Sequence, residues 1–183
     1  MRERGRTGPR LISAGDVVIT FPDRVEDRDA LEAMIFDYYA GIFPKVLAVG
    51  GPELSAAEYT AAMWDDIDDF LPPKGRIALA HDATGRLVGC GFLRECAPGG
   101  GELKRLYVAP DHLGTGLGKR LVEARIAQAR AMGLRAVYAD TVMGNTAMLR
   151  LYDKLGFQDC DRYPGNANPD EFDWMLVYRR LDL

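Results

Sequence analysis

The feature that most constrains this chain is a run of alternating glycines between a strand-like segment and a helix-like segment. Leu106–Val108 ends an apolar, β-branched stretch, and Lys119–Met132 has the spacing of an amphipathic helix. Between them lie Gly114, Gly116 and Gly118. Glycine has no Cβ, so glycines at alternate positions let backbone N–H groups turn toward one point and let a ligand approach closely. The free N–H groups and the positive dipole end of the following helix face the same point, which predicts a site for a phosphate or pyrophosphate.

Two familiar phosphate-binding loops do not fit this segment. A Walker loop would need glycine at position 113 and Ser or Thr at position 120, where this chain has Leu113 and Arg120. A dinucleotide-binding fingerprint would need its third glycine where Lys119 stands, within a βαβ unit near the start of a parallel domain. These mismatches argue against a nucleotide-phosphate binder.

The pattern along the rest of the chain predicts one mixed α/β domain. Apolar periodicity and turn residues predict strands over 16–21, 76–80, 87–94, 102–108, 135–141, 157–161 and 172–179, and helices over 27–39, 55–70, 118–132 and 145–155. This order, with no internal repeat and no low-complexity linker, favours a single domain over residues 16–183. Residues 1–15 are rich in Arg, Gly and Pro with little to bury, so we expect a flexible N-terminal tail.

The composition narrows the function classes. The chain is 48% hydrophobic and 27% charged, which excludes disordered and fibrous classes. Its formal charge of −4 and the lack of a Lys/Arg stripe argue against a nucleic-acid partner. No apolar run is long enough to span a membrane, and the three cysteines lack zinc-site or disulfide-framework spacing. We therefore expect a cytoplasmic protein with no metal and no membrane partner.

From the glycine segment onward the sequence resembles the GNAT superfamily of N-acetyltransferases. Gly116 and Gly118 match the glycine positions of its acetyl-CoA loop, and Gly114 is a common extra glycine. The strand ELKRLYV before the loop, the Asp140-Thr141 pair and the run NTAMLRLYDKLGF over 145–157 are similar to one bacterial branch. The closing segments 163–169 and 175–183 look similar as well, whereas residues 1–75 match only in layout. Leu113 departs from the usual Gln or Arg, which leaves the backbone as the expected grip on the pyrophosphate.

The resemblance implies a fold and a cofactor site. The GNAT fold has a central, mostly antiparallel and splayed sheet of about six or seven strands flanked by about four helices. The co-substrate would be acetyl-CoA, with its pantetheine arm along the strand that ends at Val108, whose N–H is our choice of donor to the thioester carbonyl. The expected cofactor-binding residues are Leu106, Tyr107, Val108, Leu113, Gly114, Thr115, Gly116, Leu117, Gly118, Lys119 and Asn145. Asn145 is explained equally well as the N-cap of its helix.

The resemblance also implies two catalytic residues. Tyr152 stands where related enzymes place a tyrosine near the CoA sulfur, so it is the candidate general acid for the leaving thiolate; the alternative is an aromatic in a packing stripe. Glu102 is the candidate general base, acting through water; the alternative is a surface glutamate paired with Lys104 or Arg105. His112 is expected to be exposed beside the phosphates.

The acceptor side follows from the first two helices, which wall that site in this fold. Tyr38 and Tyr39 are the candidate substrate contacts, with Phe43 and Trp64 as further aromatic surface. The acidic cluster at 65–69 could attract a cation, although a solvated helix face explains it too. We expect acetyl transfer to a primary amine of a small molecule or peptide. A module of the same fold that senses acyl-CoA without efficient catalysis is the alternative, and a homodimer is expected from the family alone.

Overall fold

The computed structural model describes residues 17–183, and the tail predicted for residues 1–15 lies outside this range. Its regular elements, in chain order, are β1 (Val18–Thr20), α1 (Arg28–Ala48), α2 (Ala56–Ala62), β2 (Gly75–His81), β3 (Leu87–Ala97), β4 (Gly100–Val108), α3 (Leu117–Ala131), β5 (Ala136–Val142), α4 (Thr146–Lys154), β6 (Gln158–Asp159) and β7 (Leu176–Asp182). Short 3₁₀ turns lie between several of them. The mixed α/β fold predicted from the sequence is confirmed.

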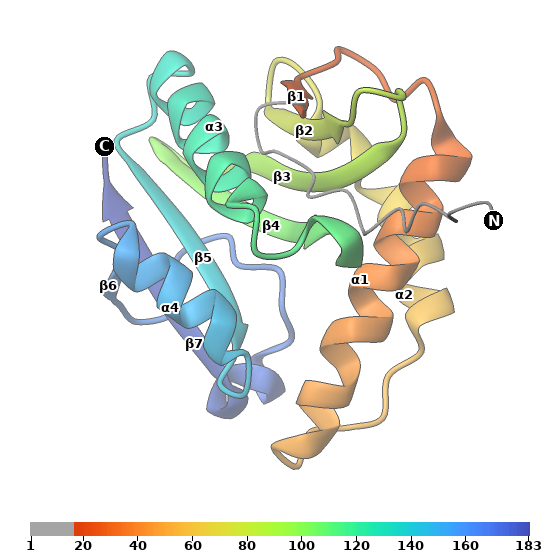
Figure 1. Cartoon of the computed structure of the whole chain (residues 1–183). Coiled ribbons are helices and arrows are strands. Elements are labelled where there is room, and N and C mark those ends of the chain that lie inside the picture. Colours follow the sequence, from red (N-terminus) through yellow and green to blue (C-terminus); the bar gives the residue numbers. More distant parts are fainter. Residues whose placement is uncertain (1–16) are drawn as a thin grey trace, which may run out of the picture.

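The strands form one seven-stranded sheet in the order β1-β2-β3-β4-β5-β7-β6 (Figure 1). All neighbours are antiparallel except β4 and β5, which run parallel. These two strands pair only from Gly100↔Ala136 to Leu103↔Ala139, although each continues beyond that point. The sheet therefore opens in its middle. Beyond Leu103 and Ala139, the backbone N–H and C=O groups of β4 and β5 do not hydrogen-bond to one another.

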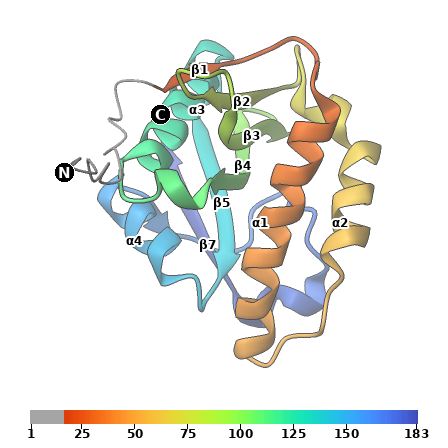
Figure 2. The same ribbon diagram turned by 45° about the vertical axis from the view of Figure 1, so that its right-hand side comes forward.

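Helices cover both faces of the sheet (Figure 2). Because successive strand residues point to opposite faces, Phe92 packs under α1 and α2 while its neighbour Leu93 packs under α3 and α4. The face under α1 and α2 buries Leu31, Ile35, Met63, Phe70 and Ile77. The face under α3 and α4 buries Val122, Ile126, Val137, Tyr152 and Phe157. The two helix layers meet over the opening between β4 and β5.

A β-bulge interrupts the pairing of β3 with β4. The register runs from Cys90↔Tyr107 to Phe92↔Lys104, so β4 carries one residue more than β3 across this interval. Arg105 occupies the extra position with a φ of +51°, a left-handed conformation that costs a non-glycine residue about 1–2 kcal/mol. The bulge lies directly after the last residue that β4 pairs with β5.

Several element bounds differ from those predicted. Helix α1 continues to Ala48 although Pro44 has no N–H to donate, because Val46 in the extra turn is buried against Met175. Helix α2 ends at Ala62, and the rest of the predicted 55–70 helix consists of two 3₁₀ turns. Asp66 leaves helical geometry between them, and its carboxylate turns to Arg105.

The strand predicted over 172–179 is also revised. Residues 170–175 form a 3₁₀ turn, and β7 begins only at Leu176. The first strand and the strand after α4 are shorter than predicted, at three and two residues. The other strands and α3 lie where the periodicity placed them, within one to three residues at each end.

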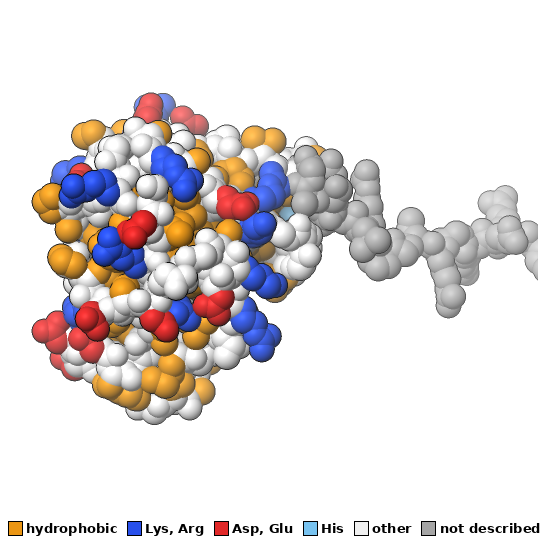
Figure 3. Space-filling view, turned by 90° about the vertical axis from the view of Figure 1, so that its left-hand side faces the viewer, with side chains coloured by type: hydrophobic (Ala, Val, Ile, Leu, Met, Phe, Trp, Pro, Cys, Tyr) orange, Lys and Arg blue, Asp and Glu red, His pale blue; other side chains and the backbone are white. Residues whose placement is uncertain are grey.

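On the face that Figure 3 shows, Lys/Arg and Asp/Glu side chains are interspersed. No helix among residues 17–183 is long and apolar enough to cross a membrane. Cys90, Cys96 and Cys160 are free thiols, and only Cys90 is fully buried.

Candidate active site

The glycine turn before α3 has the conformation that its composition predicts. Gly114 and Gly116 have φ angles of +76° and +85°, and a Cβ on either would have no atom within 4 Å. The first intrahelical bond runs from Arg120 N to Gly116 O at 3.1 Å. The N–H groups of residues 117–119 therefore have no acceptor within the helix. This is a cradle that fits a pyrophosphate.

The side chains of the turn contribute little to that cradle. Leu113 is 65% exposed, and Lys119 is an exposed partner of Glu123. Thr115 Oγ1 donates to His112 O at 2.8 Å, which leaves the hydroxyl engaged within the turn. His112 is buried rather than exposed as predicted, with its Nδ1 3.1 Å from Asp111 Oδ1, because the turn folds back over the ring. The backbone is the part of the turn that remains free to bind an anion.

The opening between the strands presents further backbone groups. Ala109 N donates to Val88 O on β3 at 2.9 Å, and successive amides of a strand point to alternate sides. The N–H of Val108 therefore points away from β3, toward the side that β5 has left. The side chains alternate as well, since Leu106 and Val108 pack toward α3 and Tyr107 packs toward α1.

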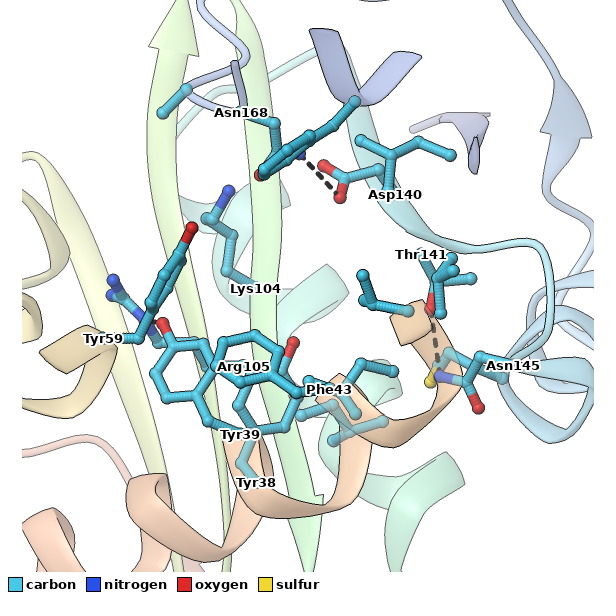
Figure 4. A pocket seen from close by; sticks show the side chains of 18 of the residues that line it. Tyr38, Tyr39, Phe43, Tyr59, Lys104, Arg105, Asp140, Thr141, Asn145 and Asn168 are labelled. Carbon is cyan, nitrogen blue, oxygen red and sulfur yellow. Dashed lines mark hydrogen bonds between the residues drawn. The ribbon is translucent and has the colours of Figure 1, made fainter. Parts of the chain in front are cut away.

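A cavity of about 310 Å³ opens at this break in the sheet (Figure 4). Its walls come from α1, α2, β4, β5, α4 and the 167–176 segment, with Arg125 reaching it from α3. Tyr38 and Tyr39 line it, as predicted for the acceptor side, together with Phe43, Tyr59 and Phe172. Trp64 does not line it, because its Nε1 donates to Glu32 and its ring lies under Arg28.

The charged groups of the cavity are mostly paired. Arg105 donates from Nε to Tyr39 Oη at 3.2 Å and from Nη2 to Asp66 Oδ2 at 3.2 Å. Of the acidic cluster predicted at 65–69, Asp66 lines the cavity, whereas Asp69 pairs with Lys74 outside it. Lys104 also lines the cavity, and its Nζ lies 3.2 Å from Glu102 Oε1.

Tyr152 of α4 reaches the same cavity from the opposite side of the sheet. It is 4% exposed, and its ring packs against Phe157. No described residue takes a hydrogen bond from its hydroxyl. Burial raises the pKa of this phenol above its usual value, opposed by the positive charge of Arg125 and reinforced by Asp140. The hydroxyl therefore stays protonated near neutral pH and is free to donate.

Glu102 is fully buried, so it is not the surface residue of the alternative interpretation. Arg94 Nε lies 2.7 Å from its Oε2, and Lys104 Nζ approaches its Oε1. Tyr163 Oη lies 2.9 Å from Glu102 Oε1 and 2.7 Å from Asp140 Oδ2, so one phenol bridges two carboxylates. Burial, and then the two carboxylates, raise the pKa of Tyr163. Glu102 itself does not line the cavity, but Asp140 does.

Asp140 is the residue that the sequence reasoning did not assign. Asn168 Nδ2 donates to its Oδ1 at 2.9 Å (Figure 4). Asn166 Nδ2 and the Tyr163 hydroxyl both donate to its Oδ2. The signal was present, because both the Asp140-Thr141 pair and the 163–169 segment belong to the resemblance. Only the fold shows that the second segment returns to hold the first.

Asn145 is the N-cap residue of α4, as the alternative interpretation has it, but its side chain makes no cap bond. Its Nδ2 donates to Thr141 Oγ1 and its Oδ1 accepts from Lys45 Nζ, both at 2.9 Å. The extra turns of α1 place Lys45 there, which ties α1 to β5 beside the cavity. Asn145 lines the cavity through this contact.

These features have clear parallels among known proteins. The profile of the acetyltransferase (GNAT) family matches residues 34–157, which include the glycine turn, the opened strands and Tyr152. The chain belongs to the GNAT acetyltransferase family. It is an acyltransferase.

Individual relatives extend this GNAT assignment over most of the chain. An uncharacterized N-acetyltransferase of Schizosaccharomyces pombe is 34% identical over 174 residues, which cover 94% of this chain and 99% of that protein. An L-methionine sulfoximine/L-methionine sulfone acetyltransferase of Pseudomonas paraeruginosa is 35% identical, covering 73% and 85%. A Salmonella typhimurium protein solved with its cofactor acetyl-CoA has a TM-score of 0.60 at 20% identity, covering 92% and 94%.

We expect Gly116→Ala to weaken acetyl-CoA binding about tenfold. An alanine avoids the left-handed conformation in the free protein by turning the peptide away, so the bound state must recover a cost of about 1–2 kcal/mol. Gly133→Ala is the matched control, because Gly133 has a φ of +77° in open space at the other end of α3. Calorimetric titration with acetyl-CoA measures both variants. An equal loss of affinity in both would contradict a specific role for the turn.

Proposed function

We propose that this acetyltransferase transfers the acetyl group of acetyl-CoA to the primary amine of a small molecule held in the cavity between α1, β4 and β5. The observation that carries the proposal is the meeting, in one cavity, of an unpartnered phenol, an aromatic wall and the Asp140 carboxylate, which Tyr163 links to the buried Glu102 behind it. In this proposal the glycine turn and the Val108 N–H hold the pyrophosphate and the thioester. The acceptor lies against Tyr38 and Tyr39.

The proton of the incoming ammonium needs an acceptor, and we assign this role to Glu102 together with Asp140. Asp140 lines the cavity, whereas Glu102 lies behind Tyr163. A water in the cavity passes the proton to Asp140, and Asp140 passes a proton to Tyr163 as Tyr163 gives its own proton to Glu102. The sequence predicted a relay through water to Glu102, and this route adds Asp140 and Tyr163 between the water and Glu102. The neutral amine then attacks the carbonyl carbon, and Tyr152 donates its proton to the departing sulfur.

The charges of the cavity favour an acceptor that also carries an anionic group. Three cationic side chains, Lys104, Arg105 and Arg125, face two carboxylates, Asp66 and Asp140, so the lining has a net charge of +1. A polyamine would add further cations to a positive wall. An amino acid with an apolar side chain would match both the charge and the aromatic surface. The relative that acts on L-methionine sulfoximine and L-methionine sulfone is consistent with this class.

We therefore expect L-methionine sulfone to be acetylated with a kcat/KM at least about tenfold higher than that of its carboxylate-free amine analogue or of spermidine, because a charge-assisted hydrogen bond contributes about 1.5–3 kcal/mol. Thiol release from acetyl-CoA, with the acetylated product identified by mass spectrometry, measures the rates. A preference for spermidine would overturn the acceptor class. Tight acetyl-CoA binding without turnover of any amine would instead indicate a sensor of acyl-CoA.

Replacing Tyr152 by Phe tests the general acid. We expect kcat to fall about 100-fold with little change in KM for acetyl-CoA, since general acid catalysis typically contributes 10²–10⁴-fold. The ring contact with Phe157 is retained, so the melting temperature should stay close to that of the wild type. Tyr138→Phe serves as a control on β5. Full kcat in a folded Tyr152→Phe enzyme would exclude the role.

Glu102→Gln and Asp140→Asn test the proton route through the pH dependence. Without the carboxylate pair only the free amine reacts, so we expect kcat/KM to fall on the acid side and to rise about tenfold per pH unit toward the pKa of the amine. Glu53→Gln removes an exposed carboxylate as a control. Circular dichroism verifies folding, because Glu102 also neutralises Arg94 and Lys104. A wild-type pH profile in both variants would remove this pair from the mechanism.

A further inference from the structure

One buried charge has no place in the mechanism described so far. Arg125 of α3 is among the largest fully buried side chains, at 1% exposure, and its guanidinium lines the cavity. Nη1 donates to Phe92 O at 3.0 Å and to Lys104 O at 3.2 Å, and Nε donates to Leu121 O at 3.1 Å. Nη2 meets no acceptor in the described part of the chain.

The sequence makes room for this guanidinium. Gly91 lies opposite the bulge, and a Cβ there would come within 2.7 Å of Arg125 Cζ and Nε. The bulge leaves the carbonyls of Phe92 and Lys104 available to Nη1, so part of the side chain acts as a clamp on the irregular backbone. A clamp accounts for the bonds of Nε and Nη1. It accounts neither for the free Nη2 nor for a full positive charge.

That charge lacks the counterion that the other buried arginine has. Arg105 pairs with Asp66, whereas no carboxylate of residues 17–183 forms an ion pair with Arg125. The titratable groups that face it are Tyr152 on α4, Cys90 on β3 and Tyr38 on α1. Burial lowers the pKa of Arg125 to about 10, so it remains protonated at neutral pH.

Holding an unpaired cation in the interior is unfavourable, and apolar residues of similar volume often replace buried charges without loss of stability. Tyr152, Cys90 and Tyr38 are all neutral at pH 7, because burial raises the pKa of each. Each of them also adjoins the cavity or the bulge. Of the carboxylates that line the same cavity, Asp66 is bonded to Arg105, and Asp140 is bonded to Tyr163, Asn166 and Asn168. Arg125 therefore has no counterion at rest, and the negative charge that the reaction creates can provide one.

We infer that Arg125 is a fixed electrostatic residue that stabilises the negative charge formed on the thioester oxygen and then on the CoA sulfur during acetyl transfer. The inference rests on the proposed function. The amine nitrogen forms a bond to the carbonyl carbon, and the C–S bond breaks with its electron pair remaining on sulfur. The thiolate takes a proton from Tyr152. Of the two protons that the ammonium nitrogen loses, one goes to the carboxylate pair before attack and the other restores the Tyr152 phenol after it. Arg125 keeps its own proton throughout and acts through its charge.

The test is the pKa of the CoA thiol in its complex with the enzyme. A nearby cation favours the thiolate, so the bound thiol should ionise at lower pH in the wild type than in Arg125→Gln. Thiolate absorbance near 235 nm, measured from about pH 6.5 to 9 against the complex with desulfo-CoA, follows this ionisation. Burial raises the pKa of Cys90 to about 12 and of Cys96 to about 11, so these protein thiols stay silent in that range.

We expect the bound thiol to titrate at least about one pH unit higher in Arg125→Gln, with kcat reduced about tenfold or more and KM for acetyl-CoA changed less than threefold. Arg125→Lys, which keeps the charge but not the full clamp, should restore most of the thiol pKa. Arg130→Gln removes an exposed charge from the same helix as the matched control. Gly91→Ala displaces the guanidinium without removing it and should raise the thiol pKa, which provides the test if Arg125→Gln does not fold.

The outcomes separate the two proposals. Equal thiol pKa values in the wild type, Arg125→Gln and Gly91→Ala, with CoA bound in each, would overturn the role of Arg125 even if the enzyme acetylates amines. Loss of activity in Arg125→Gln and Arg125→Lys alike with an unchanged thiol pKa would reduce Arg125 to a backbone clamp. Failure of the wild type to bind CoA would overturn the proposed function itself.

Discussion

The rest of the site depends on the separation of two parallel strands. Strands β4 and β5 hydrogen-bond for four residue pairs and then diverge, which leaves backbone N–H and C=O groups unpaired in the centre of the sheet. Unpaired backbone groups in a protein interior are unfavourable, so this opening needs compensation. A ligand with an amide-containing arm can pair with these groups, and acetyl-CoA has such an arm. Side chains from both helix layers reach the opening, so α1 and α2 on one face and α3 and α4 on the other all contribute to one cavity.

The bulge at Arg105 begins directly after the last paired residue of β4, and we regard the two irregularities as one device. The extra residue turns the side chain of Arg105 toward Asp66 and leaves carbonyl groups for Arg125. The side chain of Arg105 therefore extends from the bulge to Asp66, whereas the side chain of Arg125 reaches the bulge from α3. Arg105 is neutralised by its carboxylate and shapes the acceptor wall, whereas Arg125 keeps its charge beside Tyr152 and Tyr38.

Local sequence patterns predicted the backbone parts of the site. They did not predict contacts between side chains that are far apart in the sequence. The glycine turn and α3 follow from glycine conformation and apolar spacing, and both are as expected. Periodicity ended α1 before Pro44, because the packing of Val46 on Met175 involves residues far apart in sequence. The same limit explains Asp140: its partners Asn166 and Asn168 are more than 25 residues away, in a loop without periodicity. His112 and Glu102 were placed too close to solvent, because a polar residue type says little about burial once partners such as Asp111 or Tyr163 are present.

The buried charges of the site match the charges that acetyl transfer creates. Tyr163 lies between Glu102 and Asp140 with one proton for two carboxylates, so this pair has capacity for a further proton. Arg125 lacks any carboxylate, so its surroundings have capacity for a negative charge. Acetyl transfer to an ammonium removes two protons from nitrogen and leaves the electron pair of the C–S bond on sulfur. One proton goes to the carboxylate pair, the other replaces the proton that Tyr152 gives to sulfur, and the charge on sulfur forms near Arg125. Preorganised charge of this kind needs no rearrangement at the moment of reaction, which is why its cost can be carried by the folded state.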